Sequence, residues 1–221
     1  MRQSFPPYLI RYLAVLSLVL ICSAWNTVMA QEATPPQADR AVLMLNEVKA
    51  RMLEALRDPA LKNNAAGMRT TVAEVLAPKV DFYAASRLVL GKHWKSASAE
   101  EREQFVTEFR DFLVRFYASA LNGYVQEQQV PEGFMTFADE PVMQKGRQLT
   151  LRSYIWPPSG TEVPVDYRLY HSDEWRVFDV SVNGMSLARN YRAGFDSTVR
   201  KSGMTQLIAD LAAKNAELDQ P

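Results

Sequence analysis

The sequence predicts an α+β fold, in which helices pack on a curved antiparallel sheet of about four strands and an amino-terminal helical lobe precedes the sheet. Two observations support this prediction. Apolar residues recur at helical spacing from about residue 40 to 128 and again from 187 to 216, whereas residues 133–183 hold β-branched and aromatic runs separated by Pro, Gly, Ser and Asp. Helices followed by a run of antiparallel strands are typical of α+β domains, in which the helices cover one face of the sheet.

The amino terminus has the three regions of a secretory signal peptide. Arg2 and Arg11 precede or border an apolar run at residues 12–21, and the small-residue sequence VMA ends at Ala30. We therefore expect a signal peptide over residues 1–30 that is cleaved after Ala30. The apolar run is too short for a transmembrane helix, which needs about 20 residues. Cys22 follows an isoleucine where a lipidation site needs a small residue, so we expect no lipid anchor.

Charge and cysteine content exclude several classes of protein. The chain has 25 basic and 25 acidic residues, and loss of the signal peptide would lower the net charge from 0 to −2, because two arginines and no acid leave with it. A nucleic-acid-binding protein would show a basic excess, so we expect no nucleic-acid partner. The only cysteine also lies in the signal peptide, which leaves no disulfide or thiol nucleophile. These features are compatible with a monomer in the periplasm.

The helical lobe is expected over residues 40–98 and follows a flexible mature terminus at residues 31–39, whose sequence QEATPPQAD is polar. Proline and glycine mark the helix ends: one helix stops before Pro59, a second covers residues 65–76, and a short third helix ends at Gly91. Ser98 and Glu101 have the spacing of a capping box, which predicts a long helix over residues 99–128.

Four strands of a meander are expected between residues 133 and 183, at residues 134–137, 147–156, 163–170 and 175–182. In the third strand, the residues that share the face toward a core are Val163, Val165, Tyr167 and Leu169. In the fourth, strict alternation places Phe178, Val180 and Val182 opposite Trp175 and Val177. Two terminal helices should follow over residues 187–216, separated at Gly203, and the whole of residues 40–218 should form a single domain.

Catalytic and metal sites are weakly indicated. His93 and His171 have no companions at ligand spacing, so we expect no metal; His93 is interpreted as a loop residue bonded to a helix end and His171 as a solvated turn residue. No G-x-S-x-G sequence marks a hydrolase. An acid/base pair could be drawn from Asp166 or Asp179 with Tyr154 or Tyr167, although Asp166 can instead pair with Arg168 or a cross-strand partner.

The long helix carries two apolar stripes. Phe105, Phe109, Phe112 and Phe116 recur at intervals of four, three and four residues, which places them on one face. A second stripe lies beside the first and consists of Val106, Leu113, Tyr117, Leu121 and Tyr124. The simplest interpretation is that one stripe packs on the sheet and the other on the amino-terminal helices; the alternative is that the second stripe lines a cavity.

Three segments together resemble the MlaC family of periplasmic phospholipid-binding proteins, also described as toluene-tolerance auxiliary transport components. They are PKVDFYAASRLVLGKHWKSASAEEREQFVTEFRDFLVRFYASAL, VPVDYRLY and WRVFDVSVNGMSLARNYRAGFDSTVRKSGMTQLIADLAAKN. The resemblance covers about residues 42–218. The family has Arg with Tyr or Trp around the GKHW position, so His93 is a departure that argues against an essential histidine.

The resemblance implies an NTF2-like curved sheet with an added helical lobe, enclosing an apolar cavity that holds phospholipid. It also implies a lipid-asymmetry pathway with two partners: an inner-membrane ABC transporter complex that has a hexameric lipid-binding ring, and an outer-membrane lipoprotein–porin complex. No catalytic residue and no cofactor are implied, the lipid being cargo. Residues chosen as lipid-facing from apolar character and expected position are Val80, Leu88, Tyr117, Leu121, Tyr124, Leu151, Tyr154, Tyr167, Val177, Val180, Met185, Leu187 and Tyr191.

Three hypotheses therefore stand. The first is a periplasmic carrier that binds acyl chains in an apolar cavity and shuttles phospholipid between the two membrane complexes. The second is an NTF2-like small-molecule enzyme that uses an Asp/Tyr pair in the cavity. The third is an exported interaction domain with a filled core.

Overall fold

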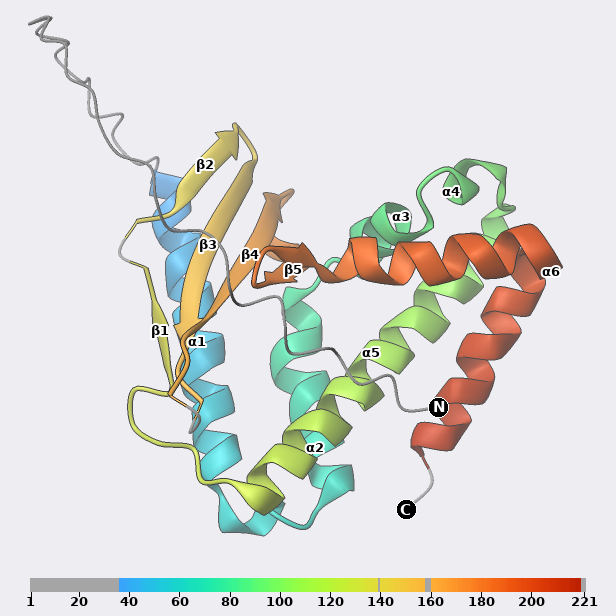
Figure 1. Ribbon diagram of the computed structural model, residues 1–221. Helices are drawn as coiled ribbons and strands as arrows, with labels where there is room; N and C mark the ends of the chain where they lie inside the picture. The colour runs from blue at the N-terminus through green and yellow to red at the C-terminus, as the bar shows by residue number, and fades with distance from the viewer. Residues whose placement is uncertain (1–35, 139, 158–159, 220–221) are drawn as a thin grey trace, which may run out of the picture. The chain divides into compact units, whose positions relative to one another are not determined.

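The computed structural model describes residues 36–138, 140–157 and 160–219, and these show the expected α+β arrangement of helices and an antiparallel sheet (Figure 1). The predicted signal peptide and residues 31–35 of the predicted mature terminus lie outside the described residues. Within the described ranges, none of the helices is long and apolar enough to cross a membrane.

The first helix, α1 (Pro36–Arg57), begins before the expected position near residue 40, so the prediction that residues 36–39 are flexible is wrong. Proline is well accommodated in the first turn of a helix, where its missing N–H has no partner to lose, and Asp39 stabilises the same turn. Ala38 and Ala41 are also buried, which ties this turn to the sheet. After α1, a short 3₁₀ turn, η1 (Pro59–Leu61), is capped by Asp58, whose side chain accepts a hydrogen bond from the backbone N–H of Ala60.

The expected helix at residues 65–76 is present but changes its winding. α2 (Ala65–Thr71) is followed by a π-helical turn, η2 (Val72–Leu76), and a 3₁₀ turn, η3 (Ala77–Lys79). The N–H of Ala77 bonds to the carbonyl of Val72, five residues earlier. Pro78 follows at once and cannot donate to the i−4 carbonyl, which accounts for the change of winding at this point.

The next helices confirm the capping signals. α3 (Phe82–Leu90) is capped by Asp81 and ends at Gly91, whose φ of 56° is rarely adopted by a residue with a side chain. A single turn, α4 (His93–Ser96), leads to α5 (Ala99–Glu127), and the capping box between Ser98 and Glu101 is present in both directions.

The sheet has six described strands, two more than expected. Strand order is β1-β3-β4-β5-β6, with β2 also paired to β3, and all pairs are antiparallel. The strands are β1 (Met135–Phe137), β2 (Val142–Lys145), β3 (Gln148–Ile155), β4 (Val163–His171), β5 (Trp175–Val182) and β6 (Met185–Ser186). The unexpected strands are short, and neither β2 nor β6 has a run of alternating apolar residues that would predict it.

A bulge in β5 changes which residues share a face. Arg168 of β4 pairs with Asp179, but the next residue, Leu169, pairs with Val177, so Phe178 is an extra residue in β5. Val177 and Val180 therefore both pack into the same apolar cluster. The expected strict alternation, which separated Val180 from Val177, is wrong because it assumed a strand without a bulge.

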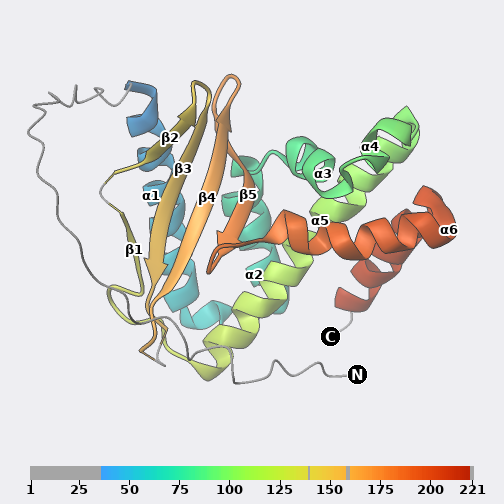
Figure 2. The same ribbon diagram turned by 45° about the horizontal axis from the view of Figure 1, so that its top comes forward.

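The last helix, α6 (Leu187–Leu218), is broken at Gly203 (φ 85°, ψ 173°), as expected. In both views α1 lies along one face of the sheet, whereas α6 leaves the sheet after β6 and crosses α5 (Figures 1 and 2). The helices thus form two groups. One group consists of α1, α2 and the carboxyl-terminal part of α5, and the other consists of α3, α4, the amino-terminal part of α5 and α6.

Candidate lipid-binding site

Buried apolar residues form three clusters. The sheet cluster joins the first half of α1 to strands β3, β4 and β5; its buried members are Ala38, Ala41, Leu45, Leu149, Leu151, Leu169, Trp175 and Val177. The helical cluster joins the second half of α1 to α2, η2 and α5; its buried members are Met52, Met68, Val72, Val75, Ala118 and Val125. The α6 cluster joins α3, α4 and α5 to α6. Helix α1 is the element shared by the first two clusters.

The first aromatic stripe of α5 packs on α6 and not on the sheet. Phe109 meets Tyr191 and Phe195 of α6 edge to face, with ring centroids 5.9 and 5.8 Å apart, and Phe105 meets Phe195 in the same way at 5.7 Å. Phe105 and Phe109 are buried, whereas Phe116 at the end of the stripe is 41% exposed. This stripe is core because α6 lies across it, and a periodic pattern in α5 alone could not identify its partner helix.

The second stripe is divided between two clusters. Leu121 and Tyr124 pack against the helical cluster, whereas Val106 and Leu113 pack against the α6 cluster. Tyr117 lies between them, in edge-to-face contact with the exposed Phe116 ring. Burial, with a smaller effect from Tyr191, raises the pKa of the Tyr117 hydroxyl, which therefore stays protonated in an apolar environment.

Most of the residues predicted to face lipid are distributed over the three clusters. The structure places Leu151, Tyr167, Val177 and Val180 in or against the sheet cluster, Leu121 and Tyr124 against the helical cluster, and Leu88 and Tyr191 against the α6 cluster. Val80 lies beside Val177 in an isolated bridge, Tyr117 lies on α5 beside Phe116, and Leu187 is the half-buried first residue of α6. Partly exposed apolar side chains pack against both the sheet cluster and the helical cluster, which share α1.

Two of the predicted residues do not face the interior. Met185 is 68% exposed, because it follows the tight turn at Asn183 and Gly184 in a two-residue strand at the edge of the sheet. Tyr154 follows the buried Ser153 in β3, and its hydroxyl interacts with Arg152, which shares the opposite face of the strand. The direction of a side chain in a strand depends on register, which apolar character alone does not give.

No direct hydrogen bond joins a candidate Asp to a candidate Tyr of the enzyme hypothesis among the described residues, although Asp166 and Tyr154 both interact with Arg152. Asp166 accepts two hydrogen bonds from Arg152, at 2.6 and 2.8 Å, as the cross-strand interpretation anticipated. Asp179 has a fully buried side chain, and its carboxylate accepts hydrogen bonds from three groups of the protein.

The donors to Asp179 connect the sheet to the start of α6. Ser186 Oγ donates at 2.7 Å, the N–H of Ala188 at 3.2 Å and Arg168 Nη1 at 3.3 Å. Ser186 also caps α6 by accepting from the N–H of Arg189. These contacts fix the direction in which α6 leaves the sheet.

Neither histidine lies in a metal site, and the described residues contain no group of three or more His, Cys, Asp or Glu side chains that could hold one. His93 is the first residue of α4 and not a loop residue; its Nε2 lies 2.7 Å from Asp196 of α6. His93, followed by Lys92, lowers the pKa of the Asp196 carboxyl to about 2. His171 is half-buried against the Trp175 ring, so the interpretation of a solvated turn residue is wrong.

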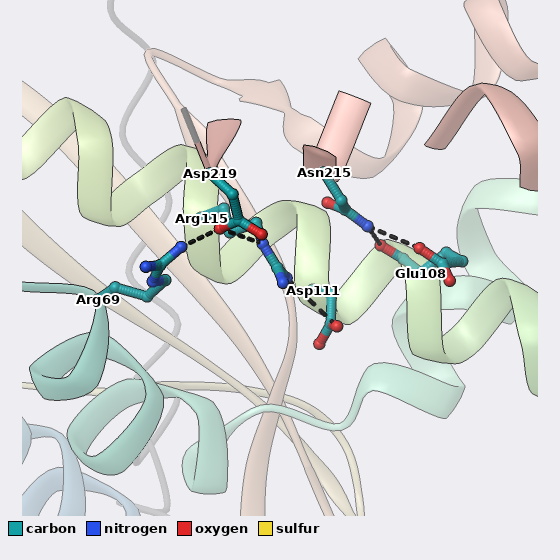
Figure 3. Close-up of polar contacts among 6 residues, drawn as sticks. All are labelled: Arg69, Glu108, Asp111, Arg115, Asn215 and Asp219. Atoms are coloured by element: carbon teal, nitrogen blue, oxygen red, sulfur yellow. Dashed lines mark hydrogen bonds and ion pairs between the residues drawn. The ribbon is translucent and has the colours of Figure 1, made fainter. Parts of the chain in front are cut away.

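The carboxyl-terminal end of α6 is fastened to α2 and α5 by a polar cluster (Figure 3). Asp219 forms ion pairs with Arg69 of α2 and Arg115 of α5, and Arg115 also contacts Asp111 at 3.2 Å. The hydrogen bond from Arg115 is the main cause that lowers the pKa of the Asp219 carboxyl. One turn earlier, Asn215 donates to the backbone and side chain of Glu108 of α5.

Sequence reasoning missed two polar features beside the apolar interior. Ser153 of β3 is fully buried, and its hydroxyl donates to Tyr167 at 3.2 Å. Lys49 of α1 places its ammonium 5.3 Å from the centre of the Phe137 ring. The signals were present in the sequence: Ser153 takes the inward position after Leu149 and Leu151, and Lys49 lies on the apolar side of its helix.

A surface groove of about 320 Å³ lies where the first half of α1 passes the β4–β5 turn. Its walls mix basic and acidic side chains, with Arg40 and Lys79 beside Glu47, Asp173 and Glu174. Ionised groups of both signs are unfavourable surroundings for an acyl chain, so this groove is not the candidate lipid site.

Comparisons with known proteins agree with this architecture. A family model described as MlaC protein matches residues 46–213. The chain is 24% identical over 207 residues to the intermembrane phospholipid transport system binding protein MlaC of Haemophilus influenzae, covering 91% of each chain. It is 25% identical over 144 residues to the toluene tolerance protein ttg2D of Pseudomonas putida, covering 64% of each chain.

A solved structure shares the fold. The phospholipid-binding protein of Ralstonia solanacearum, determined in complex with a phospholipid, superposes with a TM-score of 0.67. The two chains are 24% identical, and the match covers 80% of this chain and 98% of that one. The likeness confirms the predicted combination of an antiparallel sheet, packed helices and an amino-terminal helical region.

Proposed function

Because the chain belongs to the MlaC family, we propose that it is a non-enzymatic carrier that binds the acyl chains of phospholipid in its apolar interior and transports the lipid through the periplasm. The observation that carries this proposal is the family match over residues 46–213, which includes members of all three clusters described above. The relatives named for phospholipid transport and the phospholipid-bound structure of the same fold support it.

The physical demand on such a carrier is large. Moving an acyl chain from a bilayer into water costs about 0.8 kcal/mol per methylene, or roughly 10 kcal/mol for a long chain. The protein must offset this cost with apolar surface that is not already buried against itself. Partly exposed apolar side chains beside a sheet covered by helices meet this requirement better than a filled core does.

The proposed position of the chains is between the sheet cluster and the helical cluster, beside α1. Tyr167 and Val180 supply the partly exposed wall on the sheet side, and Leu121 and Tyr124 supply it on the helical side. The buried hydroxyl of Tyr124 has no hydrogen-bond partner among the described residues, which is expensive in a sealed core and easier to explain where a ligand or water enters.

The proposed route has two ends. By family membership, one partner would be the inner-membrane ABC transporter complex with its hexameric lipid-binding ring, and the other an outer-membrane lipoprotein–porin complex. The name of the Haemophilus relative, which specifies intermembrane phospholipid transport, supports a route between membranes. Site-specific cross-linking in intact cells tests each partner: a carrier should be captured on both complexes, and capture on neither would contradict the shuttle.

Lipid extraction tests the carrier proposal directly. Protein purified from the cell envelope is extracted with organic solvent, and the extract is quantified by mass spectrometry. We expect stoichiometric diacyl phospholipid. An empty protein that also takes no lipid from phospholipid vesicles would overturn the proposal and would favour the third hypothesis, an interaction domain with a filled core.

A further inference from the structure

Side chains from four elements meet around the ring of Phe137 in β1. Lys49 of α1 holds its ammonium 5.3 Å from the centre of this ring. Tyr167 of β4 lies on it with ring centres 5.9 Å apart, and Ser153 of β3 is its cross-strand neighbour in the β1–β3 register. One cation and two hydroxyls are thus gathered at one edge of the apolar interior.

Lys49 has an unusual position for a lysine. Leu45 of the sheet cluster lies four residues before it and Met52 of the helical cluster lies three residues after it, so Lys49 occupies the apolar side of α1 where these clusters meet. It is half-buried, and no carboxylate of the described residues forms an ion pair with it. A half-buried ammonium whose neighbour is an aromatic ring is poised to accept an anion.

The two hydroxyls have one unused donor. Ser153 and Tyr167 carry two hydroxyl protons, and the bond between them at 3.2 Å uses one. The other proton has no acceptor among the described residues. Ser153 is fully buried, and burial is the main cause that raises the pKa of the Tyr167 hydroxyl, so the pair stays protonated and can donate to a neutral acceptor such as an ester carbonyl.

We propose that Lys49, Tyr167 and Ser153 form the subsite that recognises the phosphate and glycerol-ester region of a bound phospholipid. Lys49 binds the phosphodiester oxygens as a point charge, and the free hydroxyl proton of the Ser153–Tyr167 pair is donated to an ester carbonyl. A phospholipid carries these groups in the same order, anion first and esters next, at the point where its apolar chains begin. The subsite rests on the proposed function and adds the position and chemical selection of the lipid head region.

A competition between two lipids with the same chains tests the role of Lys49. The full chain is incubated with vesicles of dioleoyl phosphatidylglycerol that contain about one part in ten of dioleoylglycerol, reisolated, and its bound lipids are measured by mass spectrometry. The ratio of phospholipid to dioleoylglycerol bound to wild type should exceed the ratio in the vesicles by about 10-fold, which is the effect of one charge-assisted hydrogen bond. Lys49→Gln should lose this enrichment, and Lys49→Arg should keep most of it.

The matched control is Lys201→Gln, which removes an exposed lysine from α6. It should keep the wild-type ratio. Equal loss in both glutamine variants would show a general charge effect and overturn the assignment, as would wild-type protein that takes both lipids in the vesicle ratio. Failure of wild type to take either lipid would instead sink the carrier proposal, so the two failures are distinguishable.

A second pair of probes tests the hydroxyls. Tyr167→Phe keeps the ring on Phe137 and removes only the hydroxyl. Offered equal amounts of diester and diether phosphatidylglycerol, wild type should prefer the diester by about 5-fold, the effect of one neutral hydrogen bond, and Tyr167→Phe should take both equally. An unchanged preference in Tyr167→Phe would contradict a carbonyl bound at this hydroxyl.

Glycerol phosphate without acyl chains separates a lipid phosphate from a free one. We expect no saturable binding of this probe to the lipid-free protein by calorimetry, because the chains supply most of the affinity. Saturable binding that is lost in Lys49→Gln would assign the subsite to a soluble anion and overturn its proposed role in lipid recognition.

Discussion

Asp179 is the residue whose removal should most weaken the join between the sheet and α6. Its side chain is fully buried, and its carboxylate accepts from Ser186 Oγ at 2.7 Å, Ala188 N–H at 3.2 Å and Arg168 Nη1 at 3.3 Å. Asp179→Ala leaves all three donors without an acceptor and leaves the guanidinium of Arg168, which is 30% exposed, without its carboxylate.

The expected cost follows from these contacts. Removing one partner of a buried charge pair lowers the free energy of unfolding by about 3–5 kcal/mol, because the remaining charge and donors stay desolvated. Partial exposure of Arg168 lets water reach its guanidinium, which favours the lower end of that range. Asp179→Asn removes the charge and replaces one of the two acceptor oxygens with an NH₂ group but keeps the other, so its cost should be about half as large. For a domain of this size, the Asp179→Ala midpoint should fall by roughly 6–12 °C.

Urea denaturation followed by circular dichroism measures the change, and Asp173→Asn, an exposed aspartate in the β4–β5 turn, is the control. In a double-mutant cycle, adding Arg168→Met to Asp179→Ala should cost less than the sum of the single changes, because the unpaired guanidinium is removed. A loss below about 1 kcal/mol for Asp179→Ala, or strict additivity in the cycle, would refute the view that this network fixes α6.

Two further predictions concern the contacts of α3 and α4 with α6. The pKa of Asp196 is lowered to about 2, chiefly by His93, so the stabilising effect of its carboxylate is present above about pH 4 and is lost as the pH falls through about 2. Wild type should therefore be more stable than Asp196→Asn near pH 6 but not near pH 2. Thermal denaturation at both pH values measures this difference. Gly91 has a φ of 56°, and an added Cβ would lie 3.3 Å from Arg192 Nε, so Gly91→Ala should lower the free energy of unfolding by about 1–3 kcal/mol. In the matched control Gly123→Ala, the new Cβ lies within α5 with nothing within 4 Å, so the free energy of unfolding should rise by about 0.5–1 kcal/mol. Equal effects at the two glycines would contradict the proposed strain at Gly91.

Local signals in the sequence were sufficient for most elements of the fold. Ser98 and Glu101 predicted the start of α5, and the break at Gly203 was correctly placed, because capping and glycine geometry act over a few residues. The bulge at Phe178 was not predictable in the same way, since it depends on how β5 pairs with β4. Strand β2 was missed for the same reason: it exists because β3 offers a free edge, not because its own residues alternate.

The candidate site was predictable only in part, because apolar side chains that pack against protein and those that would contact lipid have the same sequence pattern. Phe109 and Leu121 lie on neighbouring stripes of α5, yet one is core beneath α6 and the other borders the helical cluster. The partner of each stripe is fixed by the path of α6, which the distant Asp179 network sets. Long-range topology therefore decides which stripe is available to a ligand.

Polar residues that interrupt these apolar patterns are the more informative sequence signal. A lysine at position 49 interrupts the stripe that Leu45 and Met52 define, and a serine at position 153 interrupts the inward series of Leu149 and Leu151. A lysine or serine at such a position makes the fold less stable than an aliphatic residue would, because its ammonium or hydroxyl is desolvated. The fold brings both to the Phe137 ring, although they come from elements about 100 residues apart. Folding alone does not explain why two such destabilising residues lie at the same ring. A ligand that has an anion beside an ester explains both.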